Sequence, residues 1–198
     1  MRRLIALTAC AVLVSSLSAC SIELGGPPTG GPKCPTRIEP TPKGVNGSLL
    51  LTAQAVPNAA VVPCLRPLPA GWTFHDLTAR KGKARIVLDF GRDTNRAATI
   101  TLTRTCDVRG ATEAFSDVPG VRKYELVHDS KSSYRSDRFY VNSGSCITHH
   151  FVLNSSTGAA QVSALTRALG FVDRAVLRRY VHDYSDGRFE LDPTPEAS

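Results

Sequence analysis

A strict alternation of apolar and polar residues in two neighbouring segments constrains the fold of this chain more than any other feature. Apolar side chains take every second position in residues 84–90, and they do so again in residues 98–103, where threonines fill the positions between. Successive side chains of a β-strand point to opposite faces, and the polar residues 91–96 supply a turn between the two segments. The pattern predicts an antiparallel meander with one buried face.

Further elements are expected on both sides of this meander. A strand begins at Trp72. Three more strand-like runs follow, at residues 122–127, 136–142 and 146–153. The chain then changes to helical spacing, with one helix after Gly158 and a second that uses Asp173 as its N-cap. Strands followed by helices predict an α+β fold: an antiparallel sheet of five to six strands with two C-terminal helices packed on one face.

Two apolar segments lack a clear period. Residues 49–56 fit either a short helix or a buried strand, and Pro57 ends the run. We expect a short helix there, followed by an extended edge at residues 61–62. Phe189 and Leu191 indicate a short final strand before the tail.

The first twenty residues have the layout of an export signal. Two arginines precede an apolar run over residues 4–17, which is short for a bilayer span, and the run ends in Leu17-Ser18-Ala19-Cys20. This ending resembles the lipobox of bacterial lipoproteins, in which the cysteine becomes the N-terminus and carries the lipid. The resemblance implies a diacylglyceryl-type anchor on Cys20 and a place at the extracytoplasmic face of the cell membrane. A soluble secreted protein cut at Ala19 and an uncleaved anchor are the alternatives.

The composition changes after the signal and predicts four regions. Glycines and prolines between residues 25 and 42 oppose both helix and sheet, which is typical of a tether. We therefore expect a signal peptide at 1–19, a Gly/Pro-rich tether at 20–47, a single disulfide-stapled α+β domain at 48–192 and a flexible tail at 193–198.

Cysteine usage fits an exported protein. Four cysteines remain beyond the signal and Cys20, namely Cys34, Cys64, Cys106 and Cys146. An even number in an exported chain predicts two disulfides, and the absence of CxxC spacing argues against a zinc site. Three pairings are possible. We expect Cys106–Cys146, because both residues end predicted strands, and this leaves Cys34–Cys64 to tie the tether to the domain.

The charge favours anionic partners. The formal charge of +7 includes Arg2 and Arg3, which leave with the signal. The remaining excess of basic residues favours weak attraction to anionic lipid or wall polymer. No basic-aromatic motif indicates nucleic-acid binding, and no motif indicates a cofactor.

No catalytic motif is present, so histidines are the remaining candidates. His75, His128 and His182 each precede an aspartate, but neighbouring residues on a strand or helix diverge and do not form a dyad. His149 falls on the inward face of its strand, where a hydrogen-bonded core histidine is favoured over a ligand-binding one. The enzyme hypothesis is a cell-envelope hydrolase or metal-dependent enzyme that uses His149 with His75 or His128 and Asp107.

Basic residues on the last helix give a candidate contact surface. Arg174 and Arg178 are expected on one face, opposite an apolar stripe from Leu177 to Tyr184. We therefore expect a membrane-anchored, non-catalytic binding or accessory module of the cell envelope. It would contact an envelope protein, anionic lipid or wall polymer through these arginines or through the threonine face of the sheet. A small-ligand carrier, the third hypothesis, requires a concave apolar cavity.

Overall fold

A computed structural model describes residues 30–35, 47–92, 94–129, 132–154 and 156–192. The predicted signal peptide, the lipid-bearing Cys20, most of the tether and the tail at 193–198 lie outside these residues and stay predictions.

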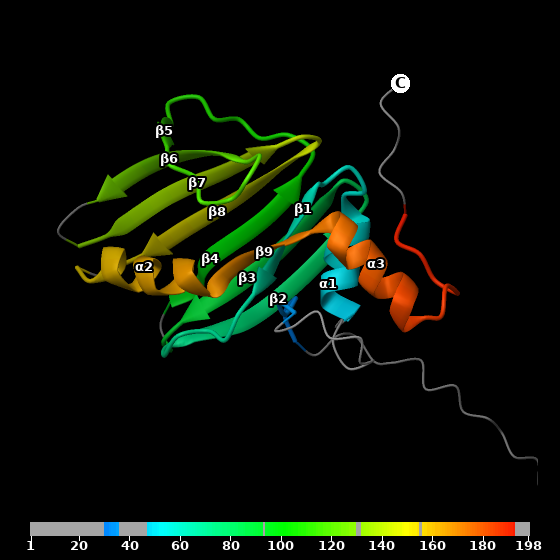
Figure 1. The fold of residues 1–198 in the computed structure, drawn as a ribbon. Coiled ribbons are helices and arrows are strands. Elements are labelled where there is room, and N and C mark those ends of the chain that lie inside the picture. Colours follow the sequence, from blue (N-terminus) through cyan, green and yellow to red (C-terminus); the bar gives the residue numbers. More distant parts are fainter. Residues whose placement is uncertain (1–29, 36–46, 93, 130–131, 155, 193–198) are drawn as a thin grey trace, which may run out of the picture.

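A seven-stranded antiparallel sheet forms most of the domain, in the order β2-β3-β4-β8-β7-β6-β5 (Figure 1). The strands are β2 (Trp72–Arg80), β3 (Lys83–Phe90), β4 (Thr94–Thr103), β5 (Thr112–Ala114), β6 (Arg122–Asp129), β7 (Tyr134–Asn142) and β8 (Ser145–Leu153). The antiparallel meander is confirmed, with Ala84, Ile86 and Leu88 of β3 buried on one face. The sheet is larger than predicted because β5, three residues long, has no alternation of its own and forms only by pairing with β6.

A two-stranded antiparallel ribbon lies on one face of the sheet. It pairs β1 (Val61–Leu65) with β9 (Leu169–Asp173), and the predicted extended edge at residues 61–62 belongs to it. β9 was not predicted, because its five residues lie between two helices and Gly170 reads as a helix stop. Pro63 fits in β1, since a ribbon of two strands leaves one edge without ladder bonds.

Three helices accompany the strands: α1 (Gly47–Ala55), α2 (Gly158–Ala168) and α3 (Arg174–Tyr184). Residues 49–56 thus form the expected short helix, and Asp173 caps α3 by accepting hydrogen bonds from the amides of Ala175 and Val176. No strand forms at residues 189–191, where the Phe189 side chain is exposed and Leu191 is buried against α3 and the ribbon. Among the described residues, no helix is both long and apolar enough to span a bilayer.

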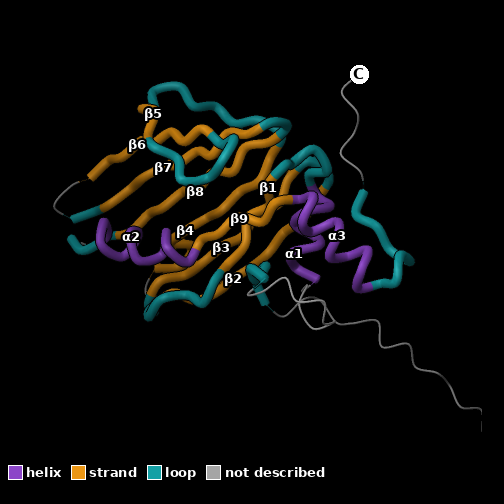
Figure 2. Tube along the Cα trace, in the orientation of Figure 1, coloured by secondary structure: helices purple, strands orange, loops and turns teal. Residues whose placement is uncertain are grey.

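The helices bury their apolar residues in two separate clusters. Val162 and Leu165 of α2 join the main core on the inner face of the sheet. Leu177 and Val181 of α3 instead pack with α1 on the other side of the ribbon, and α1 and α3 lie together at one end of the domain (Figure 2). The sequence predicted that the two C-terminal helices pack together on one face of the sheet, and this part of the prediction is wrong. The ribbon separates them because β9 occupies the link between them.

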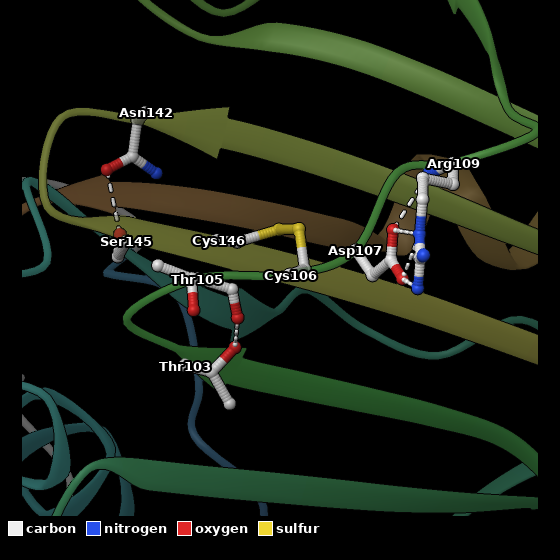
Figure 3. The surroundings of a disulfide bond; sticks show 8 residues. All are labelled: Thr103, Thr105, Cys106, Asp107, Arg109, Asn142, Ser145 and Cys146. Atoms are coloured by element: carbon white, nitrogen blue, oxygen red, sulfur yellow. Dashed lines mark hydrogen bonds and ion pairs between the residues drawn. A yellow bond between two sulfur atoms is a disulfide. The ribbon is translucent and has the colours of Figure 1, made fainter.

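Both predicted disulfides are present. Cys34–Cys64 joins residues 30–35 to β1, and this segment also accepts and donates backbone hydrogen bonds with Leu65. Residues 30–35, predicted as tether, are therefore held on the domain. Cys106–Cys146 joins the loop after β4 to the start of β8, beside a hydrogen bond from Ser145 to Asn142 (Figure 3).

Gly144 is required by the hairpin between β7 and β8. Its φ of +79° suits the tight two-residue turn, and a Cβ there would lie 2.5 Å from the carbonyl oxygen of Asn58. The turn therefore packs directly on the loop that precedes β1.

Candidate functional site

The face of the sheet opposite the core carries the candidate site, and we call it the open face. The ribbon and α2 pack on the inner face, in the same apolar cluster as the inward residues of β3, β4 and β8. On the open face, Val87 and Cys146 are buried, and the other described side chains of β2, β3, β4 and β6–β8 are half-buried or exposed.

Strand register arranges the open face in rows that cross the sheet from β2 to β6. The first row is Arg80, Lys83, Thr103, Cys146, Val141 and Arg122. The second row is Thr78, Arg85, Thr101, Thr148, Phe139 and Tyr124. The third row is Asp76, Val87, Thr99, His150, Asp137 and Leu126. The first two rows contain basic residues and no acidic residue, whereas the third row contains Asp76 and Asp137. We call the end of the open face with the first two rows the basic end.

A shallow hollow of about 330 Å³ lies at the corner of this basic end on β2 and β3. Thr78, Arg80, Lys83 and Arg85 line it. Arg85 lies 3.9 Å from Asp76, whereas Arg80 and Lys83 form no ion pair with any described residue. Three cations and a hydroxyl donor around one hollow favour an anionic ligand such as a phosphate or carboxylate.

Two histidine–aspartate pairs lie on the open face beyond the basic end. His75 Nδ1 donates to Asp89 Oδ2 at 2.7 Å, and His150 Nδ1 donates to Asp137 Oδ1 at the same distance. Burial raises the pKa of Asp89, but hydrogen bonds and positive charge from Arg96 and His75 outweigh this effect and leave it below its usual value. Each pair joins neighbouring strands, and His75 pairs with Asp89 and not with Asp76, which follows it in the chain.

His149 lies on the inner face, as predicted from alternation, and is only 1% exposed. Its ring stacks on Phe171 of β9 and contacts Tyr140, and its Nδ1 has no hydrogen-bond partner among the described residues. Burial, together with the positive charges of Arg138 and Lys123, lowers the pKa of His149 to about 3. The residue is therefore a neutral core histidine and is not accessible to a ligand.

Charged residues beside His149 form a connected group on the inner face. Glu125 Oε1 accepts from Lys123 Nζ at 2.8 Å and lies 3.2 Å from Arg138 Nε, and Arg138 also donates to Thr166 of α2. Arg138 lies over the ring of Phe151 at 5.5 Å. These contacts hold the guanidinium near His149, and burial raises the pKa of the adjacent Tyr140 to about 12.

The residues of the enzyme hypothesis are not brought together. His149 points into the core, His75 lies on the open face, and His128 is an exposed residue on β6. Asp107 lies in the loop after β4 and pairs with Arg109 (Figure 3). Hydrogen bonds from Arg109 lower the pKa of Asp107. In the described part of the chain, no three histidine, cysteine or acidic side chains cluster as metal ligands do.

Arg174 is not a surface residue, contrary to the prediction. It is 2% exposed, and its guanidinium donates to the carbonyl oxygens of Ala53 at 2.7 Å and Asp192 at 3.0 Å. The reason is helical spacing: Arg174 precedes Leu177 by three residues and Val181 by seven, which places all three on the buried face of α3. Arg178 is exposed, beside a hollow of about 350 Å³ that Asp183 and Glu190 also line.

Sequence reasoning missed the basic end and both histidine–aspartate pairs. The local alternation does assign Arg80, Lys83 and Arg85 to the outward side of their strands. Which of these side chains lie opposite one another, however, depends on the register of the β2–β3 and β7–β8 hairpins.

Comparisons with protein-family models, with curated proteins and with solved structures found no match to this chain.

Proposed function

We propose that this chain is a lipid-anchored extracytoplasmic binding module that holds anionic phospholipid headgroups at the basic end of its open face. The observation that carries the proposal is the hollow lined by Arg80, Lys83 and Arg85, two of which have no ion-pair partner among the described residues. A basic side chain near an anionic membrane surface contributes about 1 kcal/mol of binding free energy.

The position of the predicted anchor favours a lipid surface as the partner. Residues 30–35 lie beside Phe74 of β2, and the same strand carries Thr78 and Arg80 of the hollow. Four residues of a strand span about 13 Å, and the ten residues from Cys20 to Gly30 reach at most about 35 Å. An anchor on Cys20 therefore lets the edge strand β2 reach the headgroups of the bilayer that holds it.

Two observations favour this function over the other hypotheses. The hollow on α3 mixes Arg178 and Arg179 with acidic neighbours, so its charge selects an anion less than the basic end does. A hydrolase or metal enzyme needs its groups to converge within hydrogen-bond reach, whereas His149 and His75 lie on opposite faces of the sheet. A non-catalytic module requires no such convergence.

The anchor and the surface are tested separately. Peptide mapping of protein taken from the native membrane is expected to give a lipid-modified peptide that begins at Cys20, and an unmodified N-terminus would refute the anchor.

The binding surface is tested with a chain that begins at residue 20 and carries Cys20→Ser, so that no lipid is attached. This chain is sedimented with phosphatidylglycerol vesicles and with neutral phosphatidylcholine vesicles. We expect binding to the anionic vesicles alone, and we expect it to weaken as salt screens the charges.

A triple variant with serine at 80, 83 and 85 locates the binding surface. Loss of three basic residues at about 1 kcal/mol each weakens binding to anionic vesicles about 100-fold. The matched control replaces Arg135, Arg178 and Arg179 by serine, which removes the same charge elsewhere. Equal losses in the two variants would show that net charge alone drives binding, and equal binding to neutral vesicles would refute an electrostatic surface.

A further inference from the structure

A second concave region, which we call the anchor-side pocket, lies where residues 30–35 meet β1 and β2. Its volume is about 860 Å³, within the range of small-molecule sites. Leu65, Leu68 and Phe74 supply apolar walls, and Cys34 adds its half of a disulfide. The pocket is distinct from the basic end, because it lies toward the inner side of β2, where Phe74 packs against the main core.

The walls of this pocket are held in place by covalent and close contacts. The Cys34–Cys64 disulfide and two backbone hydrogen bonds with Leu65 fix residues 30–35 against β1. A Cβ at Gly31 would lie 2.7 Å from Leu65 and 2.8 Å from Phe74, so the backbone approaches both walls as closely as a residue can. A pocket formed in this way needs little ordering when a ligand binds.

Two cations lie at the pocket, and no acidic side chain among the described residues lines it. Lys33 and Arg66 are both exposed, and neither forms an ion pair with a residue that the structure describes. One nitrogen of Arg66 donates to the carbonyl oxygen of Arg167 at 3.1 Å, which orients the guanidinium beside the pocket. Apolar walls with cations at the rim complement a molecule that has a hydrocarbon part and one anionic group.

We infer that the anchor-side pocket binds a single-chain amphipathic anion of the fatty-acid class. The hydrocarbon chain lies against Leu65, Leu68 and Phe74, and the carboxylate lies at Lys33 and Arg66. This binding activity goes beyond the proposed headgroup contact, since it uses other residues and takes one molecule into a pocket instead of holding a surface.

Oleate is the probe for this inference, measured by calorimetry below its micelle concentration on the processed chain with Cys20→Ser. We expect one molecule of oleate per chain, and weaker binding of methyl oleate, which lacks the negative charge. Lys33→Gln is expected to weaken oleate binding by no more than about fivefold, because an exposed ion pair contributes little.

Gly30→Trp tests the location of the site. A Cβ at Gly30 meets no heavy atom within 4 Å and Gly30 lines the pocket, so the indole has room to fill it and is expected to abolish oleate binding. Gly47→Trp is the matched control, because Gly47 also has open space around its Cβ, has no positive φ, and lies outside the pocket lining. It is expected to bind oleate like the unsubstituted chain.

Three results would overturn the inference. Oleate binding that survives Gly30→Trp would place the ligand elsewhere, and equal affinity for oleate and methyl oleate would exclude the role of the cations. Absence of oleate binding to the unsubstituted chain would refute the inference, and a lower melting temperature for Gly30→Trp would then show that the chain itself fills the pocket. Vesicle binding through the basic end is measured independently, so that its failure and the failure of this inference are distinguishable.

Discussion

The buried His149 predicts a specific loss of stability in acid. Its pKa of 6.5 in the unfolded chain falls to about 3 in the folded protein, because burial and the nearby positive charges oppose protonation. As pH decreases, the unfolded chain therefore takes up the proton first. The stability that His149 contributes is complete above pH 6.5, decreases below it, and stops decreasing near pH 3.

The size of the effect follows from the two pKa values. At pH 5 the unfolded histidine is almost fully protonated while the folded one stays neutral, and this difference costs about 2 kcal/mol of unfolding free energy relative to pH 8. For a domain of marginal stability such a loss is easily measured. Other groups also titrate between these two pH values, so the contribution of His149 has to be isolated by substitution.

His149→Phe isolates this contribution. Phenylalanine does not titrate, and any packing cost of the larger ring against Phe171 is independent of pH. Urea unfolding, followed by the fluorescence of the buried Trp72, is measured at pH 8 and pH 5. The difference between the two pH values should be about 2 kcal/mol smaller in the variant. His128→Gln, a change in an exposed histidine of β6, should keep the full acid loss. Identical pH dependence in His149→Phe and the unsubstituted protein would refute the reasoning.

Three further predictions use the same urea assay at pH 8. Gly144→Ala should lower the free energy of unfolding by about 2–4 kcal/mol, because the new Cβ would lie 2.5 Å from a backbone oxygen and alanine disfavours the positive φ at this position. Gly82→Ala, which has the positive φ but open space, should cost only about 1–2 kcal/mol, and equal losses would contradict the role of the contact. Arg174→Met should cost about 2–4 kcal/mol by leaving two carbonyl oxygens without their donors, whereas Arg178→Met should change stability by less than about 0.5 kcal/mol. Asp173→Ala should cost about 1 kcal/mol by removing the N-cap of α3, and an unchanged midpoint would show that the cap is not needed.

Elements with a local period could be predicted from the sequence. The alternation in β3 and β4, the N-cap at Asp173 and the inward position of His149 all depend on residues a few positions apart. In each case the physical cause lies within one element. The expected disulfide pairing is also present, although Cys106 lies in the loop after β4 and Cys146 lies at the start of β8.

Pairing between distant segments could not be predicted. β9 and β5 are short and have no pattern of their own, and they are strands because β1 and β6 supply their hydrogen bonds. The partners of His75 and His150 likewise come from neighbouring strands, 14 and 13 residues away in the chain. The register of the β2–β3 and β7–β8 hairpins brings them together, and a bulge between Phe74 and Asp76 shifts the first of these registers.

The candidate site divides in the same way. The sequence by itself determined the basic charge of the chain, the outward direction of Arg80 and Arg85, and the lipobox-like ending at Cys20. Only the tertiary structure decided that cations gather at one end of the open face, that Arg174 is buried, and that residues 30–35 line a pocket. Side-chain direction follows from backbone geometry within one strand, whereas the burial of Arg174 and the walls of the pocket require segments distant in sequence to meet.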